Sequence, residues 1–241
     1  MELLNSDIRC EQLYFSRGEF RLKIDGLNIR CGEKIAVLGE NGCGKTTLLQ
    51  LMAGVLTPER GFVYINGNPR LNVEKKAEVI SYLPQEAGLL FNLTVYELIN
   101  LTYNEKTGLT GMGKTEMLEA LELEMFMDRE YHSLSGGEKR RAMLARALCR
   151  NTPFVLLDEP AAPLDLRHGW LAMTHISRAS CAAVVAMHDI NMALRYFDRF
   201  ILMKNGEVAF DKGKNEINEN ILEEVYSVPM RRVDDFFVIA V

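Results

Sequence analysis

The amino-acid sequence predicts an α/β protein with a parallel-sheet core, antiparallel strands near its N-terminus and an inserted helical block. Short apolar runs at 154–158 and 182–187 have the length and composition of strands buried in a parallel sheet. Residues 1–33 alternate apolar and polar side chains, as half-buried antiparallel strands do. From Leu93 to about Arg150 the chain is rich in Leu, Glu, Met and Ala at helical spacing.

The first third of the chain holds most of the predicted strands. A strand over 34–39 ("KIAVLG") leads through a glycine-rich loop into a helix over 46–56 ("TTLLQLMAGVL"). The segment 62–70 ("FVYINGNPR") is predicted to be a strand that ends at an Asn-Gly turn, and 78–84 ("EVISYLP") a further strand.

The helical block is predicted to span 89–150. Helical periodicity is clear in "VYELINLTY" (95–103) and "TEMLEALELEMF" (115–126), and glycines at 108, 111 and 113 separate the two pieces. The glycines therefore predict a break between two helices of the insert.

The chain then returns to the core. The strands at 154–158 and 182–187 have a helical region between them, and 201–210 is a hairpin around Asn205-Gly206. A helix over 216–226 and a strand over 236–241 follow. We therefore expect a single domain over 1–241, with a core from 1–88 and 151–241 and a helical subdomain from 89–150.

Composition limits the classes of function. Apolar residues make up 48% of the 241 residues and charged residues 25%, which are values of a globular protein. The sequence shows no apolar run of membrane-spanning length and no signal peptide. The net charge of −5 gives no reason to expect nucleic acid as a partner, and the basic run Lys139-Arg140-Arg141 is predicted to be a solvated helix face. Five scattered cysteines without a Cys-x-x-Cys pair predict a soluble protein of a reducing compartment, with neither disulfides nor a zinc site.

The stretch "GENGCGKTTLL" is typical of a phosphate-binding loop. It contains Gly39-x4-Gly44-Lys45-Thr46 between a predicted strand and a predicted helix. Glycines let the backbone wrap closely around phosphate oxygens, and free N–H groups at the helix start favour anions. Lys45 would add a positive charge on the outer phosphates, and the Thr46 hydroxyl would ligate Mg²⁺. The predicted nucleotide-binding residues of the loop are Gly39, Glu40, Asn41, Gly42, Cys43, Gly44, Lys45, Thr46 and Thr47.

The stretch "LSGGEKRRAMLARAL" begins with a capping-box pattern. Ser135 precedes Glu138 by the spacing that joins a helix cap to its third residue. Gly136 and Gly137 in the first turn of a helix lower its stability, so a benefit from exposed N–H groups is expected there. This predicts a second anion-binding site.

Polar residues follow three further apolar strands. "FVLLDEP" ends in Asp158 and Glu159, and "AAVVAMHD" continues into His188. Ligands collect at the carboxyl ends of the strands in open parallel sheets. Asp158 would hold Mg²⁺, Glu159 would orient a water molecule, and His188 would lie beside the phosphate site. Gln85 in "SYLPQEAG" also lies just past a predicted strand.

Together and in this order, the motifs resemble those of the ATP-binding cassette (ABC) ATPases over residues 8–230. "GENGCGKTT" corresponds to the Walker A loop, Gln85 to the Q-loop glutamine and "LLDE" to the Walker B strand. Ser135, Gly136, Gly137 and Glu138 correspond to the signature motif, Asp165 to the D-loop and His188 to the switch histidine. The resemblance implies a P-loop NTPase core of the RecA-like type, with an antiparallel β subdomain and an inserted α-helical subdomain.

The resemblance also implies ATP and Mg²⁺ as cofactors and a second copy of the chain as partner. In this family two cassettes pack head to tail, and each signature motif caps the ATP held by the opposite Walker A loop. Thr46, Gln85 and Asp158 would serve Mg²⁺. Lys45, Glu159 and His188 would act in catalysis, with Glu159 polarising the attacking water and His188 contacting the γ-phosphate.

Two positions depart from the family pattern. The aromatic residue that stacks on adenine aligns with Arg17 or Ser16, so Tyr14 or Phe15 would have to replace it. The D-loop reads "AAPLD", with alanines at 161 and 162 where hydroxyl residues are usual. Cross-dimer communication is therefore expected to differ from the family pattern.

The tail "HDINMALRYFDRFILMKNGEVAFDKG" resembles the ATPase subunits of chelate importers, whose cargo is iron–siderophore, haem, vitamin B12 or molybdate. This implies a subunit on the inner face of the cell membrane, with integral membrane permease subunits as partners and, indirectly, an external substrate-binding protein. An exporter ATPase and a soluble ABC ATPase, such as one of iron–sulfur cluster assembly, are the alternatives. Residues of "EAGLLFNLTVYEL" after Gln85 either pack the insert onto the core or line a groove for a permease helix; these are Leu89, Leu90, Phe91 and Leu93.

Overall fold

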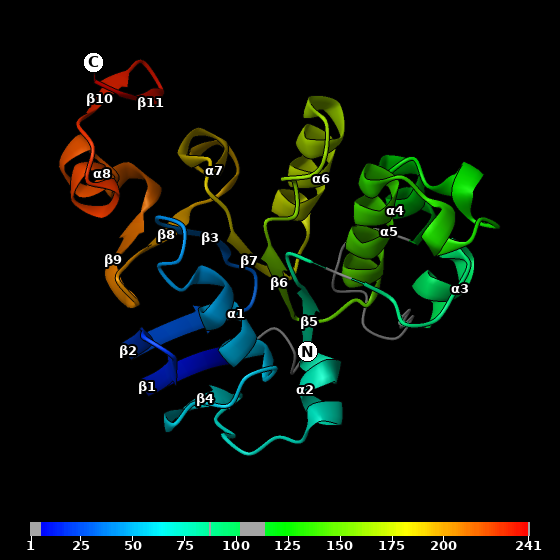
Figure 1. Ribbon diagram of the computed structural model, residues 1–241, viewed down its shortest axis with the longest axis horizontal. Coiled ribbons are helices and arrows are strands. Elements are labelled where there is room, and N and C mark those ends of the chain that lie inside the picture. Colours follow the sequence, from blue (N-terminus) through cyan, green and yellow to red (C-terminus); the bar gives the residue numbers. More distant parts are fainter. Residues whose placement is uncertain (1–5, 87, 102–113, 241) are drawn as a thin grey trace.

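One nine-stranded sheet runs through the molecule (Figure 1). The computed structural model describes residues 6–86, 88–101 and 114–240. The strand order across the sheet is β4-β1-β2-β9-β8-β3-β7-β6-β5, and a separate two-stranded sheet, β10-β11, lies near the C-terminus. The predicted α/β class is therefore confirmed.

The parallel core consists of five neighbouring strands. They are β8 (Arg199–Lys204), β3 (Lys34–Leu38), β7 (Ala182–Ala186), β6 (Phe154–Asp158) and β5 (Ile80–Leu83). Their carboxyl ends therefore meet at one edge of the sheet, which is where ligands bind in open parallel sheets.

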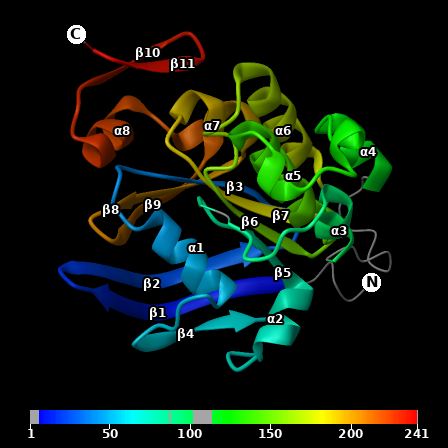
Figure 2. The same ribbon diagram turned by 45° about the vertical axis from the view of Figure 1, so that its right-hand side comes forward.

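The N-terminal strands are antiparallel, as the alternation of residues predicted. The hairpin β1 (Asp7–Arg17) and β2 (Phe20–Arg30) pairs along its whole length, and β4 (Arg60–Ile65) adds to β1. Figure 2 shows these three strands side by side. A single parallel pair, Lys23 with Glu207, joins β2 to β9 (Glu207–Gly213), so the antiparallel strands extend the core sheet.

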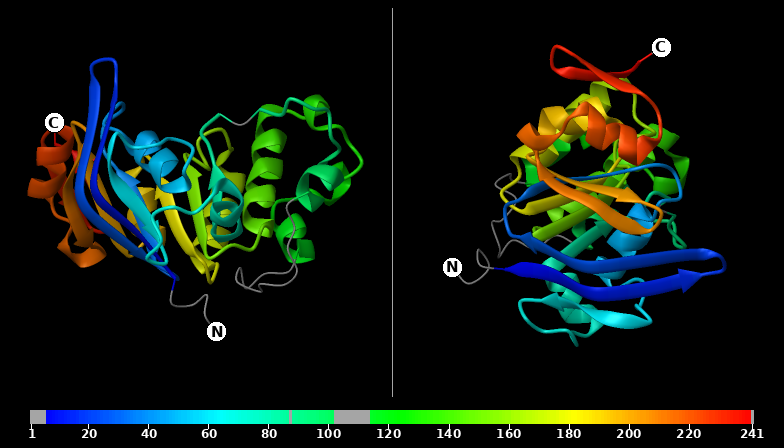
Figure 3. Two further views of the ribbon diagram at one scale, coloured as in Figure 1. Left: turned by 90° about the horizontal axis from the view of Figure 1, so that it is seen from below. Right: turned by 90° about the vertical axis from the view of Figure 1, so that its left-hand side faces the viewer.

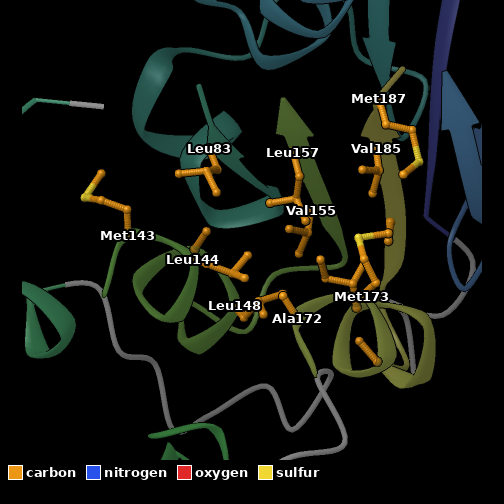
Figure 4. Close-up of a cluster of buried hydrophobic side chains, with 14 of the residues drawn as sticks. Leu83, Met143, Leu144, Leu148, Val155, Leu157, Ala172, Met173, Val185 and Met187 are labelled. Carbon is orange, nitrogen blue, oxygen red and sulfur yellow. The ribbon is translucent and has the colours of Figure 1, made fainter. Parts of the chain in front are cut away.

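Two hydrophobic cores lie on the two faces of the parallel strands. Successive strand residues point to opposite faces. Val155 and Leu157 therefore join the core formed with the helices α5 to α8, whereas Phe154 and Leu156 join the one formed with α1 and the β1–β2 hairpin. Figure 4 shows part of the first core, in which Val155 and Leu157 of β6 face Leu144 and Leu148 of α5.

The remaining helices on the core have clear end signals. α1 (Lys45–Ala53) ends at Gly54, which adopts a left-handed conformation. Asp165, Asp189 and Asn218 cap α6 (Leu166–Arg178), α7 (Ile190–Tyr196) and α8 (Glu219–Tyr226), each accepting from a backbone N–H three residues on. None of the described helices is long and apolar enough to cross a membrane.

The helical block enters the chain between β5 and β6, as predicted. Its helices are α3 (Val95–Asn100), α4 (Lys114–Ala120) and α5 (Gly136–Cys149). Figure 3 shows this block at the opposite end of the molecule from β1 and β2. The predicted separating glycines at 108, 111 and 113 lie outside the described residues. The subdomain boundaries at 89 and 150 stay a prediction.

Several details differ from the sequence-based prediction. The expected single helix over 115–126 is wrong, because α4 ends at Ala120 and Glu122 takes a φ of 50°. Leu123 N–H then bonds back to Leu118 O over 2.9 Å, which closes the helix end.

Further differences concern elements that the sequence missed and elements that are shorter than predicted. The sequence did not predict α2 (Val73–Val79), or β10 (Met230–Val233), which pairs with β11 (Phe236–Ile239). The predicted strand over 78–84 is shortened to β5, the strand over 62–70 ends with β4 at Ile65, and the helix over 216–226 begins with α8 at Glu219.

Candidate functional site

The phosphate-binding loop joins β3 to α1 in the middle of the sheet. Gly39 has a φ of 143°, and a Cβ atom there would lie 2.2 Å from the carbonyl oxygen of Met203. Only glycine therefore fits this close approach. Lys45 is 7% exposed, and its Nζ donates to the carbonyl oxygens of Gly39 at 2.7 Å and Glu40 at 3.0 Å. The loop thus holds the ammonium group over its own backbone.

Three residues from different strand ends meet beside this loop. Gln85 follows β5, Glu159 follows β6 and His188 follows β7. Gln85 Nε2 lies 3.5 Å from Glu159 Oε2, and His188 Nδ1 lies 3.9 Å from Glu159 Oε1. The structure therefore brings together three residues that lie far apart in the sequence.

Asp158 at the end of β6 is almost completely buried, with 1% of its surface exposed. Its Oδ2 has no hydrogen-bond partner among the described residues. Burial raises the pKa of this carboxyl above its ordinary value, and a hydrogen bond with the Thr46 side chain opposes the rise. A buried, unpartnered carboxylate oxygen beside a threonine hydroxyl is the donor set that Mg²⁺ accepts, so the residues present fit this ion.

A cavity of about 820 Å³ opens over the loop. Its walls combine loop residues, the strand ends and part of the β1–β2 hairpin, namely Phe15, Arg17, Phe20, Asn41, Gly42, Gly44, Lys45, Thr46, Thr47, Gln50, Leu56, Gln85, Glu159 and His188. Such a volume is typical of small-molecule sites. Most of the predicted nucleotide-binding residues therefore line one cavity.

The hairpin places only two of the four candidates for base stacking in the wall of the cavity. Phe15 and Arg17 line the cavity, whereas the ring of Tyr14 packs beneath Arg60 and the Ser16 hydroxyl donates to Glu59 over 2.6 Å. Phe20, which sequence reasoning missed, also lines the cavity. Phe20 pairs with Arg17 across the hairpin, so the strand register was the signal that could have found it.

The signature residues lie elsewhere. Ser135 caps α5 and forms the predicted capping box: Ser135 N–H donates to Glu138 Oε2 over 2.7 Å, and Glu138 N–H donates to Ser135 Oγ over 3.4 Å. None of Ser135, Gly136, Gly137 and Glu138 is among the described residues that line the loop cavity. Ser135 and Gly136 are exposed instead.

Asp165 also lies outside this cavity. It caps α6 by accepting the His168 backbone N–H at 2.9 Å, and its Oδ2 lies 2.7 Å from His168 Nδ1. These hydrogen bonds lower the pKa of Asp165. Ala161 and Ala162 line a second cavity of about 190 Å³, together with His188 and Met192.

The prediction for the basic run Lys139-Arg140-Arg141 is wrong for its two arginines. Arg140 and Arg141 were expected on a solvated helix face, but they are only 6% and 7% exposed. Backbone carbonyl groups satisfy both guanidinium groups: Arg141 donates to Leu121 O at 2.6 Å and Glu122 O at 3.2 Å. Composition alone could not reveal this, because the acceptors come from distant parts of the chain.

The fold and the site define a P-loop NTPase. Its parallel sheet carries a glycine loop, a buried lysine and carboxylates at the strand ends. The ABC transporter family model matches residues 22–162. The chain therefore belongs to the ABC transporter family as its ATP-binding cassette, and it is an ATPase.

Known relatives agree over most of the chain. It is 34% identical over 220 residues to the hemin import ATP-binding protein of Streptomyces coelicolor, which covers 86% of this chain and 79% of that protein. It is 31% identical over 231 residues to the thiamine import ATP-binding protein of Photorhabdus laumondii subsp. laumondii, covering 93% of this chain and 98% of that protein. A solved dimeric ATP-binding cassette in a post-hydrolysis state with ADP and phosphate is similar with a TM-score of 0.71 and 28% identity, covering 87% of this chain and 100% of that one.

Proposed function

We propose that this chain hydrolyses ATP to power a membrane importer for a metal chelate or a related cofactor. The observation that carries this proposal is its similarity, over 86% of its length, to a hemin import ATP-binding protein. The resemblance of the segment after His188 to chelate importers supports the same class. Thiamine is the second candidate cargo, because the thiamine import relative covers 93% of the chain.

Catalysis rests on positioning and charge. The loop amides and Lys45 would bind the β- and γ-phosphates of ATP, and Glu159 would orient the attacking water. His188 would contact the γ-phosphate from the end of β7. Asp158, Thr46 and Gln85 would hold Mg²⁺, which supplies neutralisation of phosphate charge when bound.

The apolar wall of the loop cavity would receive the adenine base. Phe15 and Phe20 are half-buried, and Arg17 is exposed at the rim. Aromatic faces and a guanidinium group both stack on flat heterocycles. These residues would replace the single stacking aromatic that is usual at this position.

A second copy of the chain would complete each site. The exposed Ser135 and Gly136 lie outside the cavity of their own chain, so they remain open to the ATP of a partner. The similar cassette that was solved as a dimer with ADP and phosphate supports a pair of chains. The head-to-tail arrangement with two bound ATP molecules is what the resemblance to the family implies. Hydrolysis would remove the bridging phosphate, and the pair would then open.

Exposed apolar side chains of the segment after Gln85 and of the helical block would contact the permease on the inner face of the membrane. Leu90 is 96%, Phe91 74% and Leu101 70% exposed, and Tyr96 and Met125 are also exposed. Leu90 and Phe91 are consecutive in the segment that follows Gln85. Large apolar side chains exposed next to each other are typical of a protein interface. The exposure of Phe91 disfavours the reading in which it packs the insert onto the core.

The decisive experiment is to purify the chain with its membrane partner and reconstitute the complex in vesicles. We expect the partner to be a permease with many membrane-spanning helices. A hemin-loaded external binding protein should stimulate ATP hydrolysis, whereas a thiamine-loaded one should not. Stimulation by thiamine alone would replace the chelate assignment.

The same purification distinguishes the other classes. Recovery with soluble scaffold proteins would indicate a cluster-assembly ATPase. Movement of cargo out of the cytoplasmic compartment would indicate an exporter.

The two-chain site has a test of its own. The variant Glu159→Gln should bind ATP without hydrolysing it and should elute as a dimer with Mg-ATP in size-exclusion chromatography. A Glu159→Gln chain that stays monomeric under these conditions would argue against the two-chain site.

A further inference from the structure

Arg140, in the second turn of α5, uses its whole guanidinium group on the protein backbone. Its five acceptors, at 2.5 to 3.3 Å, are the carbonyl oxygens of Pro84, Gln85, Asp158, Glu159 and Pro160. An arginine has five N–H donors in a rigid planar group. The contacts therefore match the full donor capacity of the side chain.

The acceptors belong to the carboxyl ends of two neighbouring strands. Pro84 and Gln85 follow β5, whereas Asp158 ends β6 and Glu159 follows it. Arg140 is 6% exposed and takes part in none of the described ion pairs. Burial lowers the pKa of its guanidinium, and the nearby charges of Asp158 and Glu159 oppose that fall. Backbone carbonyl dipoles therefore hold the buried guanidinium group of Arg140. Because these carbonyls come from the ends of both β5 and β6, the same hydrogen bonds fix the two strand ends relative to each other.

The backbone of Glu159 shows why this matters for the site. Its φ is 47°, a left-handed conformation that residues other than glycine rarely adopt. Its N–H donates to Ala186 O over 2.9 Å, and its carbonyl accepts Arg140 Nη2 over 2.9 Å. Hydrogen bonds therefore hold this strained residue from both sides, and its carboxylate points toward Gln85 at 3.5 Å.

The same arginine belongs to the helix that begins with the signature residues. Ser135 caps α5, and Arg140 follows it by little more than one turn. The start of α5 is therefore anchored to the two strand ends that carry Gln85 and Glu159. A displacement of the signature end of the helix would move the backbone of both residues.

We propose that Arg140 is a positioning residue for ATP hydrolysis, which sets Glu159 and Gln85 in place and couples them to the signature helix of the same chain. The inference rests on the roles proposed above for Glu159 and Gln85. Lysine cannot replace it, because its compact ammonium has three donors and no planar fork.

The first test compares Arg140→Lys with Arg141→Lys in the full chain. Arg141 is the matched control, because it is the next residue, is equally buried and donates to carbonyls of the 121–122 turn. We expect Arg140→Lys to lower kcat by roughly 10- to 100-fold, the scale of a small misplacement of catalytic groups, with KM for Mg-ATP nearly unchanged. Arg141→Lys should lower the melting temperature comparably with a much smaller loss of kcat. Equal loss of kcat in the two variants, or normal kcat in Arg140→Lys, would overturn the proposal.

The second test is a double-mutant cycle with Glu159→Gln, read by single-turnover hydrolysis. If Arg140 acts through Glu159, Arg140→Lys should have little further effect in the Glu159→Gln background. The same fold-loss in both backgrounds would refute the coupling. Full activity of Glu159→Gln alone would instead refute the proposed role of Glu159, so the two failures are distinguishable. Should Arg140→Lys fold poorly, Arg140→Met keeps an unbranched apolar side chain, and normal kcat in that folded variant would equally overturn the proposal.

Discussion

Replacing Asp158 by asparagine should stabilise the nucleotide-free protein while abolishing its activity. The carboxylate is buried and its Oδ2 has no partner among the described residues. Leaving such a group unpaired costs about 1–3 kcal/mol. Asparagine removes the charge but still brings an unpaired amide, so we expect a gain of about 1–2 kcal/mol. For a chain of this size, that corresponds to a rise in melting temperature of about 2–8 °C.

The effect should depend on pH in a defined direction. Burial raises the pKa of Asp158 in the folded state, so the folded protein binds this proton more tightly than the unfolded chain does. The destabilisation is therefore absent below the ordinary pKa of aspartate, grows as pH rises toward the raised value and is complete above it. The difference in the free energy of unfolding between Asp158→Asn and the wild type should therefore increase across that pH interval and stay constant above it.

The assay is a thermal melt without nucleotide, with ATP and EDTA, and with ATP and Mg²⁺. The wild type should gain additional stability from Mg²⁺, whereas Asp158→Asn should lose most of this gain. Asp235→Asn is the matched control, because that side chain is 96% exposed, and it should change neither quantity. A neutral-pH melting temperature of nucleotide-free Asp158→Asn at or below that of the wild type would refute the reasoning.

Three further outcomes are expected. Lys45→Ala should lower the ATPase rate by roughly 10²-fold or more, because it removes the cation that we propose binds the phosphates; unchanged turnover at saturating Mg-ATP would exclude the assigned loop. Ser135→Arg should also be inactive, yet mixing it with Lys45→Ala should restore activity, because both lesions then fall on one of the two composite sites; no recovery in demonstrated mixed dimers would contradict two independent trans sites. Phe91→Ala should change the free energy of unfolding by less than about 0.5 kcal/mol, since the ring is 74% exposed. The same change should weaken binding to the permease by about 1–4 kcal/mol, measured by co-purification; a large fall in melting temperature would instead indicate that Phe91 packs the insert onto the core.

The sequence predicted those parts of the site that depend on short, local sequence patterns. The loop from Gly39 to Thr47 needs glycine at fixed places, and a buried apolar strand that ends in Asp158 is readable without any tertiary information. The order of these motifs then placed them at one edge of a parallel sheet, where the structure puts Gln85, Glu159 and His188.

The residues that sequence reasoning missed depend on distant partners. Phe20 reaches the cavity through its register with Arg17 across a hairpin. Arg140 is indistinguishable from a surface arginine by composition, because its acceptors lie about twenty and fifty-five residues away along the chain. The break after α4 was missed for the opposite reason, since the periodicity continues through Glu122 although the backbone there turns left-handed. A local pattern cannot show where tertiary contacts outweigh the helix propensity of a segment.

The place of β3 in the sheet has a consequence for how the protein is made. Its two neighbours are β7 and β8, which are synthesised more than 140 residues after it, and the Gly206 N–H that follows β8 bonds to Cys43 O in the loop over 3.0 Å. During translation the loop therefore emerges long before the strands that hold it, and the contacts that complete it are among the most non-local in the chain. A nascent chain that ends before residue 182 would contain the whole phosphate-binding loop but neither of the strands, β7 and β8, that pair with β3 beside it. ATP capture should then appear late in synthesis, after the helical block is already complete.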